Sequence, residues 1–271
     1  MIQPNQQIID YLLENHEIDI SPFDASFLDR TTRNRMLATN CKSKDEYQNL
    51  LAESENEITN FKNSFSVCYS EFFRNPFTFA VLERIILPAL FYKLKKNSSQ
   101  EIRIWSAACA SGQETYSLAM LLNEVGNDDQ YNFRIFATDL NAEQIKIAQE
   151  GTYKLHDLKH LTINRLNNWF IQHNDNYKIR DELKNCIEYS NFDLLDDKYT
   201  CPPTSIFGNF DIIICSNLLF YYSPAIREKI ILKLKKSLSP NGFLITGETE
   251  REILLQYKFK EIIPPSAIFT I

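Results

Sequence analysis

The chain has 271 residues, of which 44% are hydrophobic and 24% are charged, and its formal net charge is −6 at pH 7. This composition predicts a globular protein with a substantial core, and the acidic balance argues against a broad nucleic-acid-binding surface. No apolar run approaches the roughly 20 residues that a membrane-spanning helix needs, and the first residues lack the pattern of a signal peptide, so we expect a cytoplasmic protein.

The first 62 residues are predicted to form a small helical domain. Apolar residues recur there at helical spacing, first at Ile8, Ile9 and Leu12 and later at Tyr47 and Leu51. This stretch contains no glycine, and its two prolines lie outside the apolar stripes, so nothing interrupts the helices.

Residues 63–97 are predicted to link this domain to the rest of the chain. The linker contains an aromatic run that ends at Arg74, followed by an apolar helix from Phe77 to about Leu94. The planar guanidinium of an arginine suits a carboxylate, although an isolated arginine is more often a surface residue.

Residues 98–271 are predicted to form an α/β domain. Strands are expected at 102–107, 133–137, 210–215 and 243–246, and helices at 114–125, 142–149 and from Pro224 onward. Pro240-Asn241-Gly242 is predicted to be a turn, and 255–259 and 267–271 to be the last two strands. Alternating strands and helices predict a parallel sheet whose ligands bind at the carboxyl ends of the strands. Residues from about 154 to 188 break the alternation and are predicted to be an inserted subdomain.

The loop after the first strand is the first candidate site. Gly112 lets the backbone approach a ligand closely, and the helix that follows offers free N–H groups. The loop has one glycine rather than the GxGxxG pattern, which disfavours a pyrophosphate ligand. Glu114 would attract an ammonium or sulfonium group, although a glutamate there also stabilises the start of a helix.

The ends of two further strands supply more candidates. Asp139 follows the second strand, where a carboxylate accepts hydrogen bonds from ribose hydroxyls, or else caps the next helix. Ser216 and Asn217 end the strand at 210–215, and Tyr221 or Tyr222 either walls a pocket or packs beneath a loop. No Ser/His/Asp triad is indicated, and six cysteines without a CxxC pair predict no metal site.

In their order and spacing, several segments resemble the CheR-type chemotaxis-receptor glutamate methyltransferases, over roughly residues 61–271. The segments are Ser70–Asn75, Ile104–Glu114, Ala137–Leu140, Gly151–Tyr153, Asp193–Leu195, Cys215–Asn217 with Tyr221, and Pro240–Gly242.

The resemblance implies a Rossmann-like methyltransferase domain with S-adenosylmethionine as methyl donor and S-adenosylhomocysteine as product. It also implies an all-α N-terminal domain, an inserted β-subdomain that can dock a receptor tail, and the cytoplasmic domain of a chemoreceptor as substrate. The cofactor-binding residues that it implies are Ser70, Arg74, Glu114, Asp139, Asp193, Leu194, Ser216 and Asn217. Arg74 and Tyr221 would act in catalysis. The resemblance implies neither a nucleic-acid partner nor a metal ion.

The sequence departs from that family at Cys68, Gln113, Thr115 and Asp193, and in an additional segment at 198–208. Two alternatives therefore stay open: transfer to another carboxylate, and a cofactor-binding sensor or adaptor without turnover. Arg30, Arg33 and Arg35 form either a positive helix face for an acidic receptor or an ordinary solvated face.

Overall fold

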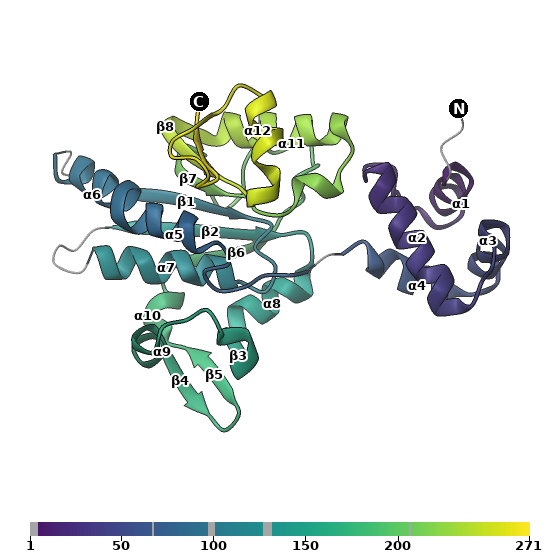
Figure 1. Cartoon of the computed structure of the whole chain (residues 1–271), viewed down its shortest axis with the longest axis horizontal. Helices are drawn as coiled ribbons and strands as arrows, with labels where there is room; N and C mark the ends of the chain where they lie inside the picture. Colours follow the sequence, from purple (N-terminus) through teal and green to yellow (C-terminus); the bar gives the residue numbers. More distant parts are fainter. Residues whose placement is uncertain (1–4, 67, 97–100, 127–131, 206) are drawn as a thin grey trace. The chain divides into compact units, whose positions relative to one another are not determined.

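The computed structural model describes residues 5–66, 68–96, 101–126, 132–205 and 207–271 (Figure 1). The expected boundary at residues 97 and 98 lies outside them. The chain divides into two compact units. The helical unit comprises Met1–Val67 with Leu219–Lys229, and the sheet unit comprises Cys68–Leu218 with Ile230–Ile271.

Four helices build most of the helical unit, and three of them begin at a capping side chain. Asp24, Ser43 and Ser54 each accept a hydrogen bond from a backbone N–H in the first turn of the next helix. The helices are α1 (Gln6–His16), α2 (Ala25–Thr39), α3 (Lys44–Glu53) and α4 (Glu55–Ser64). Their apolar stripes meet in one core, as the helical spacing predicts.

Residues 219–229 complete the helical unit from far along the chain. They contain η3 (Leu219–Tyr221) and the start of α11 (Pro224–Ser237). The rings of Phe23 and Tyr222 stack with their centroids 5.3 Å apart, and Arg227 pairs with Asp24 at 3.0 Å. Sequence spacing gives no hint of this association.

Of the three arginines proposed to form a positive face, Arg30, Arg33 and Arg35, the last is paired within the helical unit. Arg35 donates two hydrogen bonds to Glu57, at 2.9 and 2.5 Å, and the hydroxyl of Tyr47 donates to the same carboxylate at 2.7 Å. Arg33 pairs with Asp29 on the surface. The arginines therefore do not form a uniform basic stripe.

A mixed seven-stranded sheet forms the centre of the sheet unit, in the order β6-β2-β1-β7-β8-β10-β9. The first five strands in this order are parallel, and β10 and β9 are antiparallel. The strands are β1 (Ile102–Ala107), β2 (Phe133–Asp139), β6 (Ile187–Asn191), β7 (Phe210–Ile214), β8 (Leu238–Ile245), β9 (Lys260–Glu261) and β10 (Ile268–Thr270). The order reverses between β1 and β7, which places a ligand crevice at their carboxyl ends.

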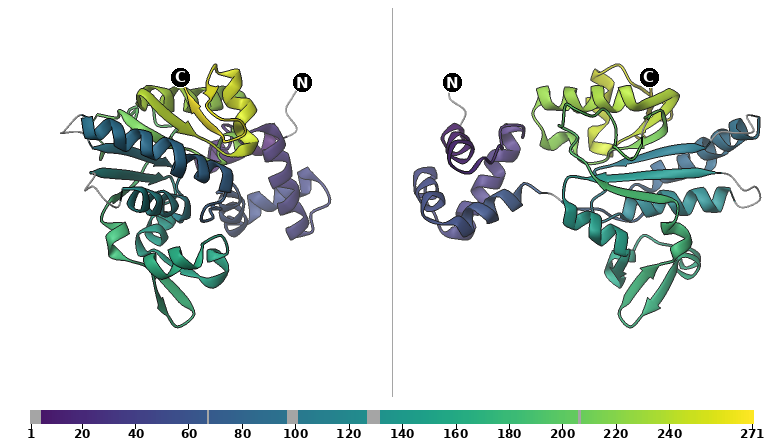
Figure 2. Two further views of the ribbon diagram at one scale, coloured as in Figure 1. Left: turned by 60° about the vertical axis from the view of Figure 1, so that its left-hand side comes forward. Right: turned by 180° about the vertical axis from the view of Figure 1, so that it is seen from behind.

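Helices cover both faces of this sheet, which confirms the predicted α/β class. Figures 1 and 2 show α7 (Gln113–Val125) and α8 (Ala142–Glu150) on one side and the second half of α11 on the other. The predicted helix after Arg74 is present as α5 (Pro76–Val81), a π-helical turn η1 (Leu82–Ile86) and α6 (Leu87–Lys96). Pro88 has no N–H to donate, and the wider turn directly before it accommodates the lost bond.

A second, three-stranded antiparallel sheet stands apart from the main one, in the order β3-β5-β4 (Figure 1). It confirms the expected inserted β-structure. Its elements are β3 (Thr152–Lys154), η2 (Leu155–Leu158), α9 (Ile163–Trp169), β4 (Phe170–His173), β5 (Asn176–Ile179) and α10 (Asp181–Lys184). Glu124 of α7 holds the insert by accepting hydrogen bonds from Arg165 and Trp169.

Two expectations near the C-terminus are wrong in detail. The expected strand at 255–259 is instead the end of α12 (Arg251–Gln256) and a loop, because its apolar residues are spaced for a helix that buries Leu254. The turn at Pro240-Asn241-Gly242 lies within β8, where the pairing with β7 is interrupted and Asn241 has a φ of 65°. Within the described residues, no helix is long and apolar enough to cross a membrane.

Candidate functional site

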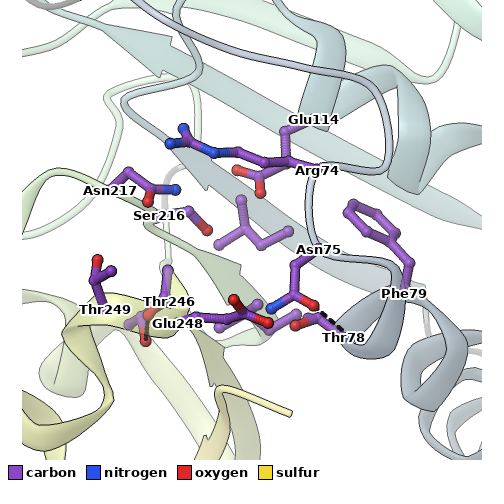
Figure 3. A pocket seen from close by; sticks show the side chains of 13 residues that line it. Arg74, Asn75, Thr78, Phe79, Glu114, Ser216, Asn217, Thr246, Glu248 and Thr249 are labelled. Atoms are coloured by element: carbon purple, nitrogen blue, oxygen red, sulfur yellow. Dashed lines mark hydrogen bonds between the residues drawn. The ribbon is translucent and has the colours of Figure 1, made fainter. Parts of the chain in front are cut away.

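A cavity lies at the carboxyl ends of β1, β7 and β8, at the switch point of the sheet. It has two lobes that share Arg74, Glu114, Ser216 and Asn217. The loop lobe is further lined by Tyr69, Ser70, Glu71, Ala108, Cys109 and Ala110. The strand lobe, of about 180 Å³, is further lined by Asn75, Thr78, Phe79, Ile214 and residues 245–249 (Figure 3).

The loop after β1 turns sharply between the strand and α7. Gly112 has a φ of 89°, and a Cβ atom there would lie 2.9 Å from the Cβ of Ala148. Ala108 and Ala110 also have left-handed backbones, with φ of 57° and 47°. Glycine is therefore required at position 112 both by its conformation and by the close approach of α8.

Glu114 is the buried acid of the cavity. Burial raises the pKa of its carboxyl to about 7, and Glu250 raises it further, while Ser216 and Arg74 oppose the shift. Its backbone N–H donates to Ser70 Oγ at 3.4 Å. A carboxylate held in this way gains most when a cationic group binds beside it.

Asp139 ends β2, one strand away from the cavity. Its Oδ2 accepts from the N–H of Ala110 at 2.8 Å and its Oδ1 from the N–H of Asn141 at 2.9 Å. Burial raises the pKa of its carboxyl despite these bonds. Asn141, not Asp139, caps α8, which leaves the remaining acceptor capacity of Asp139 for hydroxyl groups.

The ends of β7 and β8 are joined beneath the strand lobe. The Oε2 of Glu250, which is fully buried, accepts from the N–H of Asn217 at 2.7 Å and from the N–H of Gly247 at 2.8 Å. Asn217 has a left-handed backbone, with a φ of 59°. A Cβ at Gly247 would lie 2.6 Å from Asn217 Oδ1, so this glycine makes room for the asparagine side chain.

Arg74 lies between the two lobes and faces both of them (Figure 3). Its guanidinium lies 5.1 Å from the centre of the Tyr69 ring, a cation–π contact. The Tyr69 hydroxyl donates to Glu71 at 2.5 Å, and Glu71 pairs with Lys159 of the insert at 2.5 Å. The guanidinium is therefore packed from one side while its N–H groups remain available to a ligand.

The structure gathers five of the predicted residues around this one cavity: Ser70, Arg74, Glu114, Ser216 and Asn217. Asp139 contacts the cavity-lining Ala110 directly. Asp193 and Leu194 follow β6, one strand further along, where Asp193 accepts from the N–H of Leu195. Cys68 accepts a weak hydrogen bond from Asn141 at 3.7 Å.

Tyr221 belongs to the helical unit. Its ring lies 4.7 Å from that of Phe27, and its carbonyl accepts from the N–H of Asp24 at 2.8 Å. These contacts are of the kind that the packing alternative expects for Tyr221. The catalytic role of Tyr221 stays a prediction.

Sequence reasoning missed four residues that shape the site: Asn75, Asn191, Gly247 and Glu250. Asn191 donates to the carbonyls of Asp139 and Leu140, at 3.0 and 2.7 Å, and so fixes the end of β2. Glu250 carried only a weak signal, because it lies five residues beyond the end of β8 and not directly after the strand. Asn75 stood out only by its place before a helix-starting proline and at the end of the Ser70–Asn75 segment, and neither indicated a role in the site. The described residues contain no cluster of three metal-ligating side chains.

Comparison with known proteins shows which family the chain is similar to. Residues 69–264 match the family model described as CheR methyltransferase, SAM binding domain. The chain is 30% identical to a chemotaxis protein methyltransferase of Escherichia coli, over 79% of this chain and 72% of the relative. It is 29% identical to one of Borreliella burgdorferi, over 90% and 86%. A TehB-like SAM-dependent methyltransferase from Corynebacterium glutamicum superposes with a TM-score of 0.38 at 13% identity, over 81% of this chain and 98% of that one.

Proposed function

Because this chain belongs to the CheR methyltransferase family, we propose that it methylates glutamate side-chain carboxylates of a chemoreceptor, with S-adenosylmethionine as donor. The observation that carries the proposal is the cavity at the β1/β7 switch point, where Glu114 and Arg74 face the same space. We further propose that the substrate is the cytoplasmic domain of the receptor and that the enzyme acts in the cytoplasm.

The residues of the site fit the proposed cofactor. Gly112 allows close backbone approach, Glu114 offers a negative charge to a cationic group, and Asp139 offers acceptors to a ribose. Asp193 and Leu194, which follow β6, are assigned to the end of the same ligand that lies farthest from Glu114. When bound, S-adenosylmethionine supplies a methyl group that its positively charged sulfur makes electrophilic.

The chain has little proton chemistry to perform in this reaction. A glutamate with a pKa near 4.3 is already ionised at neutral pH and is itself the nucleophile. The work of the site is therefore orientation, which contributes up to roughly 7–11 kcal/mol in the best aligned reactions. Arg74 is assigned to position the acceptor carboxylate or the carboxylate of the cofactor's methionine end, and Tyr221 to shape the wall.

A methyl-transfer assay tests this function directly. Radiolabelled methyl groups from S-adenosylmethionine should enter a receptor cytoplasmic fragment as esters that alkali releases. Calorimetric binding of S-adenosylhomocysteine without transfer to any receptor fragment would instead favour the non-catalytic sensor. Alkali-labile transfer to other acidic proteins only would favour a different carboxylate substrate.

A further inference from the structure

We propose that Asn75 is a substrate-binding residue, and that its side-chain amide and Arg74 together hold the acceptor carboxylate in the strand lobe. This inference rests on the proposed function and names the part of the cavity that takes the substrate. It concerns a residue that the sequence did not single out.

The orientation of the Asn75 amide is fixed by the helix that follows it. Its Oδ1 accepts from the N–H of Thr78 at 3.2 Å, so its Nδ2 must point the other way. That Nδ2 is buried and has no hydrogen-bond partner among the described residues. Figure 3 shows it directed into the strand lobe, on the side that faces Glu248 and Thr246. A buried donor without a partner is costly, and a bound acceptor removes the cost.

The order of the strands separates the cofactor from the acceptor. Asp139 ends β2, Gly112 and Glu114 follow β1, and the strand lobe lies beyond them at the ends of β7 and β8. A ligand held by its ribose at Asp139 and by its charge at Glu114 therefore presents its reactive end toward the strand lobe. Asn75 and Arg74 line that lobe, and both offer N–H donors suited to a carboxylate.

The lobe also contains a negative charge that opposes a carboxylate substrate. The Glu248 side chain reaches into the strand lobe opposite Asn75 (Figure 3). Its charge weakens the binding of an anionic acceptor and favours release of the neutral ester product. A substitution that adds a negative charge at position 75 should therefore weaken binding of the acceptor, and one that removes the negative charge at position 248 should strengthen it.

Asn75→Asp is the sharpest variant. Aspartate caps a helix as well as asparagine does, so α5 keeps its start and the fold should be preserved. The substitution exchanges the Nδ2 donor for a negative oxygen at the same position. We expect kcat/KM for a receptor cytoplasmic fragment to fall at least about tenfold, with the Kd for S-adenosylhomocysteine within about twofold of the wild type.

Glu248→Gln is the partner variant and should raise kcat/KM for the same fragment about two- to fivefold. Asn209→Asp adds a charge at the amino end of β7, at the opposite edge of the sheet, and should change neither quantity. An unaltered melting temperature in all three variants excludes misfolding as the cause.

The outcomes separate the two ideas. If Asn75→Asp transfers normally while the wild type methylates the receptor, the inference is wrong and the function stands. If Asn75→Asp instead weakens S-adenosylhomocysteine binding, the amide serves the cofactor and the inference is again wrong. If the wild type methylates no receptor fragment, the function fails and the inference falls with it.

Discussion

The carboxylate of Glu250 accepts a hydrogen bond from the backbone N–H of Asn217 at 2.7 Å and so joins the end of β8 to the end of β7. The same oxygen accepts from Gly247. Glu250→Leu leaves the N–H groups of half-buried Asn217 and buried Gly247 without this acceptor, so we expect a loss of about 1–3 kcal/mol in unfolding free energy. Glu250→Gln keeps an acceptor oxygen and should lose less. Denaturant unfolding measures both, and equal losses in the two variants would contradict this role.

Glu114 should make ligand binding depend on pH. Because its pKa is raised to about 7 in the folded chain, the carboxyl is mostly protonated at pH 6 and mostly ionised at pH 8. If the cofactor's cationic end needs the ionised form, affinity for S-adenosylhomocysteine should rise by up to about tenfold over this range. Calorimetry at both pH values measures the rise. Glu114→Gln should bind weakly and show a flat profile, and a wild-type profile as flat as the variant's counts against the role.

The same shift carries a stability cost in the ligand-free protein. A carboxyl whose folded pKa lies above its unfolded value destabilises the fold increasingly as pH rises from about 4.5 to about 7. Glu114→Gln removes that cost. We therefore expect the melting temperature of the variant to exceed that of the wild type at pH 8, with a smaller difference at pH 5. If the difference in melting temperature shrinks as pH rises, the ionised carboxyl of Glu114 does not destabilise the fold and the prediction is wrong.

Arg74→Ala should reduce methyl transfer about a hundredfold without unfolding the protein, because the substitution removes a forked donor that faces both lobes. Arg74→Lys keeps the charge but not the fork and should recover only part of the activity. Arg134→Ala removes a half-exposed arginine that pairs with Glu101 and Glu188, and serves as the control. A radiolabelled methyl assay compares the variants, and near-normal turnover in Arg74→Ala would refute the assignment.

Tyr69 should act through Arg74. Tyr69→Leu removes the ring that lies against the guanidinium, so we expect kcat/KM to fall about fivefold. Tyr69→Phe keeps the ring and should recover most of the activity. Tyr199→Leu is the control, because that tyrosine is similarly exposed, at 50% against 57%. If the phenylalanine and leucine variants are equally impaired, the ring does not position Arg74.

The helical unit should weaken in acid through Glu57. Burial alone would raise the pKa of this carboxyl, but hydrogen bonds from Arg35 and Tyr47 outweigh it and the net shift is downward. The pair therefore stabilises the fold above the usual glutamate pKa, and the contribution is lost as pH falls through the lowered value. Arg35→Met should cost about 3 kcal/mol at pH 7, whereas Arg33→Met at the surface should cost little. Chemical unfolding of both variants at pH 7 and in acid provides the comparison.

The alternating strands and helices of the sheet unit could be predicted from the sequence, because the signals that determine them are local. The β-branched run at 210–214 and the Ser-Pro start of α11 each determine an element within a few residues. β6 was not predicted, because Ile187–Asn191 is short and its alternation rests on only two residues, Ile187 and Tyr189. The strand predicted at 267–271 is present as β10, but the one predicted at 255–259 is wrong, because Leu254 and Leu255 suit either a strand or a helix and only packing in the finished fold decides between them.

The site could be predicted where its residues lie at the end of a strand or in the loop and helix start that follow it, as at Asp139, Glu114 and Asn217. It was not readable where a residue acts through contacts across the fold. Glu250 reaches Asn217 across 33 positions, and the insert's Lys159 reaches Glu71 across 88. Such pairs depend on how strands and subdomains pack, which no short sequence pattern records.

The helical unit is assembled from two distant stretches of the chain, since residues 219–229 pack with residues from the first 67. Phe23, Asp24 and Phe27 each make a contact with that returning segment. Cutting the gene after the fourth helix would therefore leave two broken halves rather than a portable module. Recombination between relatives should preserve activity only when both stretches come from the same parent.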